Sequence, residues 1–129
     1  MLKRITALLL VCCVLLSGAN VFAAENAIQT YYLTDGYITI NIDSSGLTVT
    51  VYTDASEPVT SIYHDVSIFV NGVKYTSGSG RYSKTNSNSL TTSINVPASS
   101  GDYIDVYADH YTSHNGITEV KHSNVNYTY

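Results

Sequence analysis

Histidine and carboxylate side chains gather near the end of the chain, and they have the chemistry of zinc ligands. Zinc takes three or four such ligands at about 2 Å in a tetrahedral array. These residues would converge if the last two predicted strands pair across a turn; they are Asp109, His110, His114, Glu119 and His122. Their spacing matches no compact zinc motif, and both cysteines lie far away in the sequence. We therefore expect solvated histidines in or near a turn, and no metal site.

No set of residues matches a known catalytic arrangement. Nucleophilic catalysis needs a hydroxyl that a positioned base activates, and the many serines include no Gly-x-Ser-x-Gly elbow. Asp105 and Asp109 share one face of a predicted strand, but a flat strand face offers no pocket for glycosidase carboxylates. His64 lies on the apolar face of another predicted strand, where a structural histidine with one hydrogen bond is the simpler interpretation. We predict no enzymatic activity, no catalytic residue and no cofactor.

A row of tyrosines and aspartates is the most distinctive feature of the chain, which has 12 tyrosines and no tryptophan. The row consists of Tyr103, Asp105, Tyr107, Asp109 and Tyr111, with apolar residues between its first members. Side chains alternate between the two faces of a strand, so this row faces solvent. A tyrosine ring has a flat apolar face and a polar tip, which suits sugars and protein partners alike. We predict an interaction surface here; the alternative is that these tyrosines only favour strand formation.

Alternation with a period of two predicts seven or eight strands and no helix after residue 24. The predicted strands are 37–43, 47–53, 62–70, 73–76, 90–96, 103–111 and 117–129, with a short edge strand at 81–84. Asn71-Gly72 predicts a tight hairpin, whereas Asp54–Ser61, which contains Pro58, and Ser77–Ser89 are predicted as loops. Short strands with frequent turns indicate an all-β fold, an antiparallel β-sandwich over residues 24–129. Tyr37, Tyr52 and Tyr63 would extend the Tyr/Asp row if their strands are its neighbours.

Residues 1–23 have the features of a secretory signal peptide. Lys3 and Arg4 precede an apolar run that ends at Leu16 and is shorter than the roughly 20 residues of a bilayer-spanning helix. Small residues favour cleavage after Ala23, with Ala19 as the rival site, and an uncleaved anchor is the other interpretation. The chain after residue 23 has no further apolar run, so we expect no membrane span there. Its net charge is near −6, which argues against nucleic acid and anionic membranes as partners.

The stretch from Leu90 to Glu119 resembles the end of an immunoglobulin-like or fibronectin type III domain. An inward row at residues 90, 92, 94 and 96 is followed by Pro97, by Gly101-Asp102 and by the strand Ile104–Ala108. Residues 100–110 and 115–119 are also similar to a family of short exported proteins of Gram-positive bacteria. This resemblance implies a signal peptide followed by one immunoglobulin-like β-sandwich. It implies no catalytic residue and no ligand.

Three functions agree with these observations. We expect a secreted, non-catalytic interaction module that binds a protein or a cell-surface component through the Tyr/Asp row. A carbohydrate-binding module is the first alternative, although tryptophan, the commonest sugar platform, is missing. The second alternative is self-association into a matrix or fibre through sheet edges, because Ile38–Ile42 has high β propensity and no charge.

Overall fold

The computed structural model describes residues 31–129, which form one antiparallel sheet without any helix, so the predicted all-β class is confirmed. The strands are β1 (Leu33–Asp43), β2 (Gly46–Val70), β3 (Val73–Lys74), β4 (Gly80–Val96), β5 (Tyr103–His114) and β6 (Ile117–Thr128). The predicted signal peptide and its cleavage site lie outside the described residues. Within residues 31–129, no helix has the length and apolar character that a membrane crossing requires.

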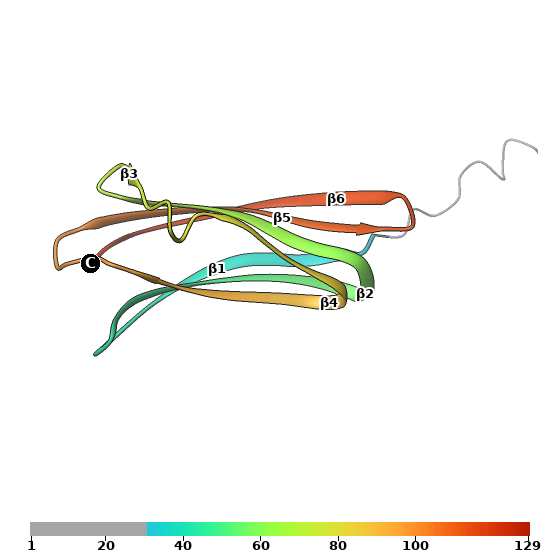
Figure 1. Ribbon diagram of the computed structural model, residues 1–129, viewed down its shortest axis with the longest axis horizontal. Helices are drawn as coiled ribbons and strands as arrows, with labels where there is room; N and C mark the ends of the chain where they lie inside the picture. The colour runs from blue at the N-terminus through green and yellow to red at the C-terminus, as the bar shows by residue number, and fades with distance from the viewer. Residues whose placement is uncertain (1–30) are drawn as a thin grey trace, which may run out of the picture. The chain divides into compact units, whose positions relative to one another are not determined.

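Strand β2 is 25 residues long and takes part in both layers of the domain. Its first half pairs with β1 and its second half with β5, while β4 pairs with both halves. The sheet therefore curls over on itself. Figure 1 shows β1, the start of β2 and the end of β4 in one layer, with β5, β6 and the rest of β2 in the other.

The bend in β2 lies where the sequence predicts a loop, and that prediction is wrong. Asp54–Ser61 remains part of the strand, and the register with β4 shifts between Asp54 and Val59. Pro58 falls inside this irregularity, where no ladder hydrogen bond from its nitrogen is required. The irregularity lets one strand turn from the first layer into the second.

The first half of β4 corrects a second predicted loop. Ser77–Ser89 is polar and rich in glycine, but from Gly80 onward it forms a strand that follows β2 around the bend. Asn86 has a φ of 49° near this bend, and asparagine tolerates this left-handed conformation better than most residues. Because β2 and β4 each run through both layers, the sheet has six strands instead of the seven or eight predicted ones.

Apolar residues at alternate positions fill the space between the layers, as the period-two pattern predicts. Apolar side chains with at most 2% exposure come from both layers and from the bend between them: Leu47, Val49, Val51, Val59, Ile62, Val66, Ile68, Ile104, Val106 and Ala108. The isoleucines of β1 share this inward direction but are less covered, and Ile42 is 39% exposed.

Two Asn-Gly turns fix the hairpins of the second layer. Asn71 and Gly72 have φ values of 51° and 78°, so the predicted hairpin is confirmed. Asn115 and Gly116 have φ values of 50° and 77° and join β5 to β6 in the same way. Strand β5 therefore continues to His114, beyond the predicted end at Tyr111.

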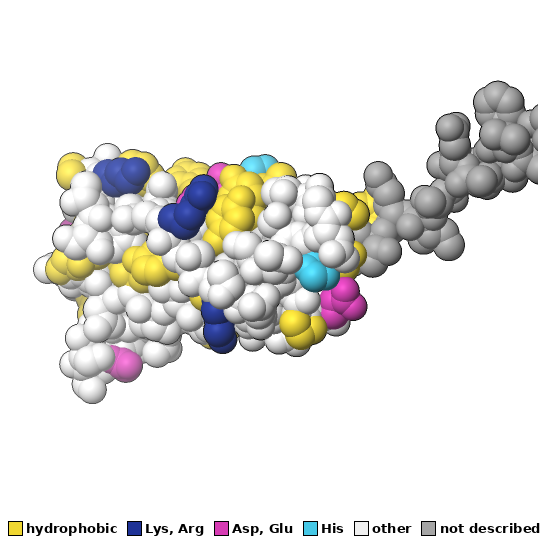
Figure 2. Space-filling view, turned by 45° about the vertical axis from the view of Figure 1, so that its right-hand side comes forward, with side chains coloured by type: hydrophobic (Ala, Val, Ile, Leu, Met, Phe, Trp, Pro, Cys, Tyr) yellow, Lys and Arg dark blue, Asp and Glu magenta, His cyan; other side chains and the backbone are white. Residues whose placement is uncertain are grey.

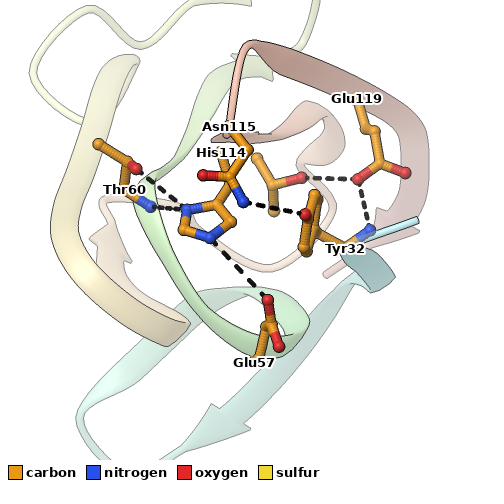
Figure 3. A network of polar contacts seen from close by, with 7 residues as sticks. Tyr32, Glu57, Thr60, His114, Asn115 and Glu119 are labelled. Carbon is orange, nitrogen blue, oxygen red and sulfur yellow. Dashed lines mark hydrogen bonds and ion pairs between the residues drawn. The ribbon is translucent and has the colours of Figure 1, made fainter. Parts of the chain in front are cut away.

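A carboxylate connects the start of β1 to the last hairpin. Glu119 Oε2 accepts a hydrogen bond from the backbone N–H of Tyr32 at 2.7 Å (Figure 3). It also accepts one from the backbone N–H of Leu33 at 2.9 Å. The Thr112 hydroxyl donates to the same oxygen at 3.2 Å. Lys121 adds an ion pair with Asp35 at 2.6 Å. These contacts close the curled sheet at one end, where β1 meets β6 without ladder pairing.

We predict that Glu119→Gln lowers the free energy of unfolding by about 1–3 kcal/mol, because an ionised acceptor of three hydrogen bonds is replaced by a neutral one. Urea denaturation measures this loss. The control is Glu57→Gln, which removes only a long, exposed contact to His114 at 3.9 Å and is expected to cost under about 0.5 kcal/mol. Equal losses in the two variants would contradict the proposed closure.

Candidate functional site

The predicted Tyr/Asp row lies on the solvent side of β5. Its members alternate with five buried residues of the same strand, which are Ile104, Val106, Ala108, His110 and Thr112. Tyr103 and Tyr107 are the most exposed members, at 42% and 48%. The structure therefore brings the five predicted surface residues together on one face, and we call this the Tyr/Asp face.

Strand β2 adds aromatic rings to the Tyr/Asp face. Tyr63 lies opposite Tyr111, and the two rings stack with centroids 4.5 Å apart at 12°. Phe69 meets Tyr107 edge to face at 6.1 Å. Tyr63 thus extends the row as expected, whereas Tyr37 and Tyr52 stack on each other in the other layer, at 4.6 Å.

Charged residues cross the Tyr/Asp face in one line over four strands. Arg81, Asp65, Asp109 and His122 are register neighbours from β4 through β2 and β5 to β6. Opposed aspartates repel each other, but each has a cationic or protonatable partner on its outer side. Arg81 holds Asp65 with two bonds of 2.7 Å, and His122 Nδ1 lies 2.6 Å from Asp109.

The electrostatics of this line favour fixed, ordered side chains. The hydrogen bonds from Arg81 lower the pKa of the Asp65 carboxyl, and Asp65 in turn raises the pKa of Arg81. The guanidinium carbon of Arg81 also lies 4.5 Å from the centre of the Tyr63 ring, in a cation–π contact.

Desolvation and the nearby aspartates raise the pKa of Tyr103 and Tyr111, so both remain hydroxyl donors at neutral pH.

Figure 2 shows hydrophobic side chains, a class that includes tyrosine, in several groups within a mostly uncharged polar surface. An open hollow of about 390 Å³ lies elsewhere, lined by Tyr31, Leu33, Glu119, Val120 and Lys121. Its carboxylate already holds the start of β1, so the hollow belongs to the closure of the fold.

A chain of hydroxyl and imidazole groups crosses the interior between the layers. Thr53 Oγ1 lies 2.9 Å from Nδ1 of His64 and 2.8 Å from Nδ1 of His110. The outer ring nitrogens reach Thr92 and Ser123, at 2.8 and 2.6 Å. The two histidines and Thr53 are fully buried. Every ring nitrogen has a partner, as buried polar groups require.

Hydrogen counting couples the tautomers of the two histidines. Thr53 has one hydroxyl hydrogen, so with neutral rings it donates to one imidazole and accepts from the other. If His64 carries its proton on Nδ1, His110 carries its own on Nε2. The reverse arrangement satisfies the same four contacts, so both histidines change tautomer together.

Burial keeps this chain neutral. Desolvation, with a smaller contribution from His110, lowers the pKa of His64 to about 4. Desolvation and Lys121 also lower the pKa of His110, against the opposing effect of Asp109 and Asp35. The expectation of solvated histidines is therefore wrong for His110, and the expectation of a single hydrogen bond is wrong for His64.

The candidate zinc ligands do not share one site. Asp109 and His122 lie on the outer face, whereas His110 and Glu119 point inward. His114 contacts Thr60 at the bend of β2 (Figure 3). Among residues 31–129, no group of three or more His, Cys, Asp or Glu side chains is arranged to hold a metal ion.

His114 lies between the hydroxyl of Thr60 and the carboxylate of Glu57, which is also the order of groups in a hydroxyl–histidine–carboxylate catalytic triad. Thr60 Oγ1 is 3.0 Å from Nδ1, but the backbone N–H of Thr60 donates to the same nitrogen at 3.1 Å. Glu57 is 3.9 Å from Nε2, beyond hydrogen-bond distance. The Tyr32 ring packs edge-on against His114 at 4.9 Å. The group fastens the β2 bend to the end of β5.

The sequence contains part of the signal for the buried row of hydroxyl and imidazole groups. His110 continues the inward row of Ile104, Val106 and Ala108, and Thr53 continues the row of Leu47, Val49 and Val51. The line from Arg81 to His122 could not be predicted, because it depends on which strands are neighbours. A comparison with protein-family models gives no match, and none is found among curated proteins.

We predict that stability falls as the pH is lowered from 6.5 to about 4. The folded pKa of His64 is below the ordinary 6.5, so in this range the unfolded chain binds more protons than the folded one. His64 alone accounts for a loss of about 3 kcal/mol across the range, and His110 acts in the same direction. Urea denaturation at several pH values measures the slope.

Two variants locate the origin of this slope. His64→Gln removes the titration and keeps hydrogen-bonding groups, so it is expected to flatten the slope. Thr91→Ala changes an exposed residue without a titratable side chain and is expected to leave the slope unchanged. Equal slopes in the two variants would exclude the buried histidines as the cause of the pH dependence.

Gly36 makes room for His110, and we predict that Gly36→Ala costs about 1–3 kcal/mol of stability. A Cβ at this position would overlap the His110 ring, and the glycine does not have a left-handed φ, so the cost is steric. In a His110→Ala background the same change is expected to cost little, which a double-mutant cycle by denaturation measures. Additive losses would mean that the contact does not limit this position.

Proposed function

We propose that the chain is a secreted, non-catalytic interaction module that binds a protein or a cell-surface component through the Tyr/Asp face. The observation that carries this proposal is the ordered aromatic and charged surface of β2 and β5. Tyrosine and arginine are typical of binding hot spots, and side chains held by neighbours lose less entropy on binding.

The ring geometry favours a protein partner over a sugar. A sugar ring stacks on an open aromatic face. The Tyr63 ring contacts Tyr111 by stacking and Arg81 by a cation–π contact, so its faces are occupied within the protein. The hydroxyls, ring edges and aspartates of the row remain for hydrogen bonds and ion pairs with a polypeptide. A glycan is therefore the alternative outcome of the test.

Two features support the immunoglobulin-like sandwich and the exported family as parts of this proposal. Antiparallel strands pack in two layers around an apolar core, and the sequence begins with signal-peptide features. The continuous course of β2 and β4 through both layers is the main departure from separate sandwich strands.

We predict that Tyr103→Ser with Tyr107→Ser weakens binding to bacterial cell-wall preparations by about tenfold or more, because two exposed anchors are lost. The probe is the fluorescently labelled protein on Gram-positive cell walls, before and after protease treatment. Loss of binding after protease treatment indicates a protein partner, and retained binding indicates a glycan. Circular dichroism checks that the fold is unchanged.

The matched control is Tyr37→Ser, which changes a tyrosine of similar exposure, 40%, in the other layer. It is expected to bind like the unmodified protein. Failure of the unmodified protein to bind any preparation, or equal binding by all variants, would refute the proposed role of the Tyr/Asp face.

A further inference from the structure

In the part of the chain that the structure describes, no strand lies beside the outer edge of β1. Among residues 31–129, β1 pairs with β2 alone. At the start of β1, Glu119 and Lys121 hold Leu33 and Asp35. From Tyr37 to Ile42 no charged residue protects the edge. Such an uncharged edge of high β propensity is a template for another strand.

The inner face of the same stretch is apolar and incompletely covered. Ile38 and Ile40 are half-buried and Ile42 is 39% exposed, although all three point toward the interior. The residues opposite them on β2 are Leu47, Val49 and Val51, which are at most 2% exposed. A strand added beside β1 would therefore cover both open backbone groups and apolar side chains.

We propose that this edge pairs with β1 of a second copy, antiparallel, with the two-fold axis at Ile40. In this register Ile40 lies opposite its own equivalent, and Ile38 lies opposite Ile42 of the second copy. Thr39 then faces Asn41, and Asp43 faces Tyr37. Six isoleucines form one row on the inner face, and no acidic residue faces another.

Other registers are poorer. An axis at Thr39 places Asp35 opposite Asp43 twice, and opposed like charges destabilise a sheet. An axis at Ile38 places Gly36 opposite Ile40 and Thr34 opposite Ile42, so most isoleucine contacts are lost. If the second copy shifts by one residue relative to these registers, the inward isoleucines of one copy lie opposite residues that are outward-facing in the other copy. An axis at Asn41 places Ile38 opposite Ser44, beyond the end of β1, and loses the Ile38–Ile42 contacts. Side-chain match and charge therefore select the axis at Ile40.

The other long strand edges between residues 31 and 129, those of β4 and β6, do not offer an equal site. β6 carries Glu119 and Lys121 on its inward face, and inward charges blunt a strand edge. The open edge of β4 is rich in serine and asparagine and carries Arg81 and Lys84. A β1–β1 contact uses the same patch on both copies, so it closes as a dimer and does not propagate into a fibre.

The oligomeric state of the purified protein tests the proposal. Sedimentation equilibrium over a wide concentration range is expected to show a monomer–dimer equilibrium. Ile40→Lys places two like charges at the axis and is expected to raise the dimer dissociation constant by about tenfold or more. Thr39→Lys adds the same charge on the outer face, where it lies opposite Asn41, and is expected to have a smaller effect. A monomer at every concentration would overturn the proposal.

Cysteine crosslinking tests the register even if Ile40→Lys does not fold. In a background with Cys12→Ser and Cys13→Ser, Ile40→Cys is expected to form a disulfide between copies under mild oxidation, because residues directly opposite in a sheet lie within disulfide range. Thr39→Cys is expected to remain reduced. A crosslink through Thr39→Cys instead, or through neither variant, would refute the axis at Ile40.

Discussion

Backbone pairing along both edges of β2 is the constraint on which the domain depends. Of the six strands that the structure describes, β2 has the most partners, because it pairs with β1, β3, β4 and β5. The register shift between Asp54 and Val59 turns this strand from one layer into the other without ending it. β2 therefore sets the register of the strands in both layers. It also contributes inward-facing apolar residues to both layers, which is why these rows of residues meet in one core.

The polar chain between the layers adds specificity to this apolar core. Thr53 and Thr92 belong to the first layer, whereas His64, His110 and Ser123 belong to the second. A shift of the layers would leave buried polar groups without partners, which costs more than a hydrogen bond contributes. The close fit of Gly36 against His110 restricts the same junction sterically.

Local patterns in the sequence predict the strands better than they predict strand continuity. Period-two alternation identifies the inward rows and the Tyr/Asp face, and Asn71-Gly72 identifies a hairpin, because these depend on near neighbours. Pro58 and the polar stretch after Ser77 indicate loops by composition, but long-range pairing along β2 holds both regions in strands. The contacts of Arg81 with Asp65 and of His110 with Thr53 depend on tertiary neighbours, which one sequence does not reveal.

The placement of the strand ends has a mechanical consequence. β1 begins beside the turn that opens β6, and the chain ends at the opposite pole, where Tyr129 pairs with the backbone of Gly101 and Asp102 (Figure 1). Tension between the two ends runs along the strands, so the ladder bonds of β1 with β2 and of β5 with β6 are loaded together in shear. If the two ends of the domain are pulled apart, the domain resists extension, because many ladder hydrogen bonds must break at the same time.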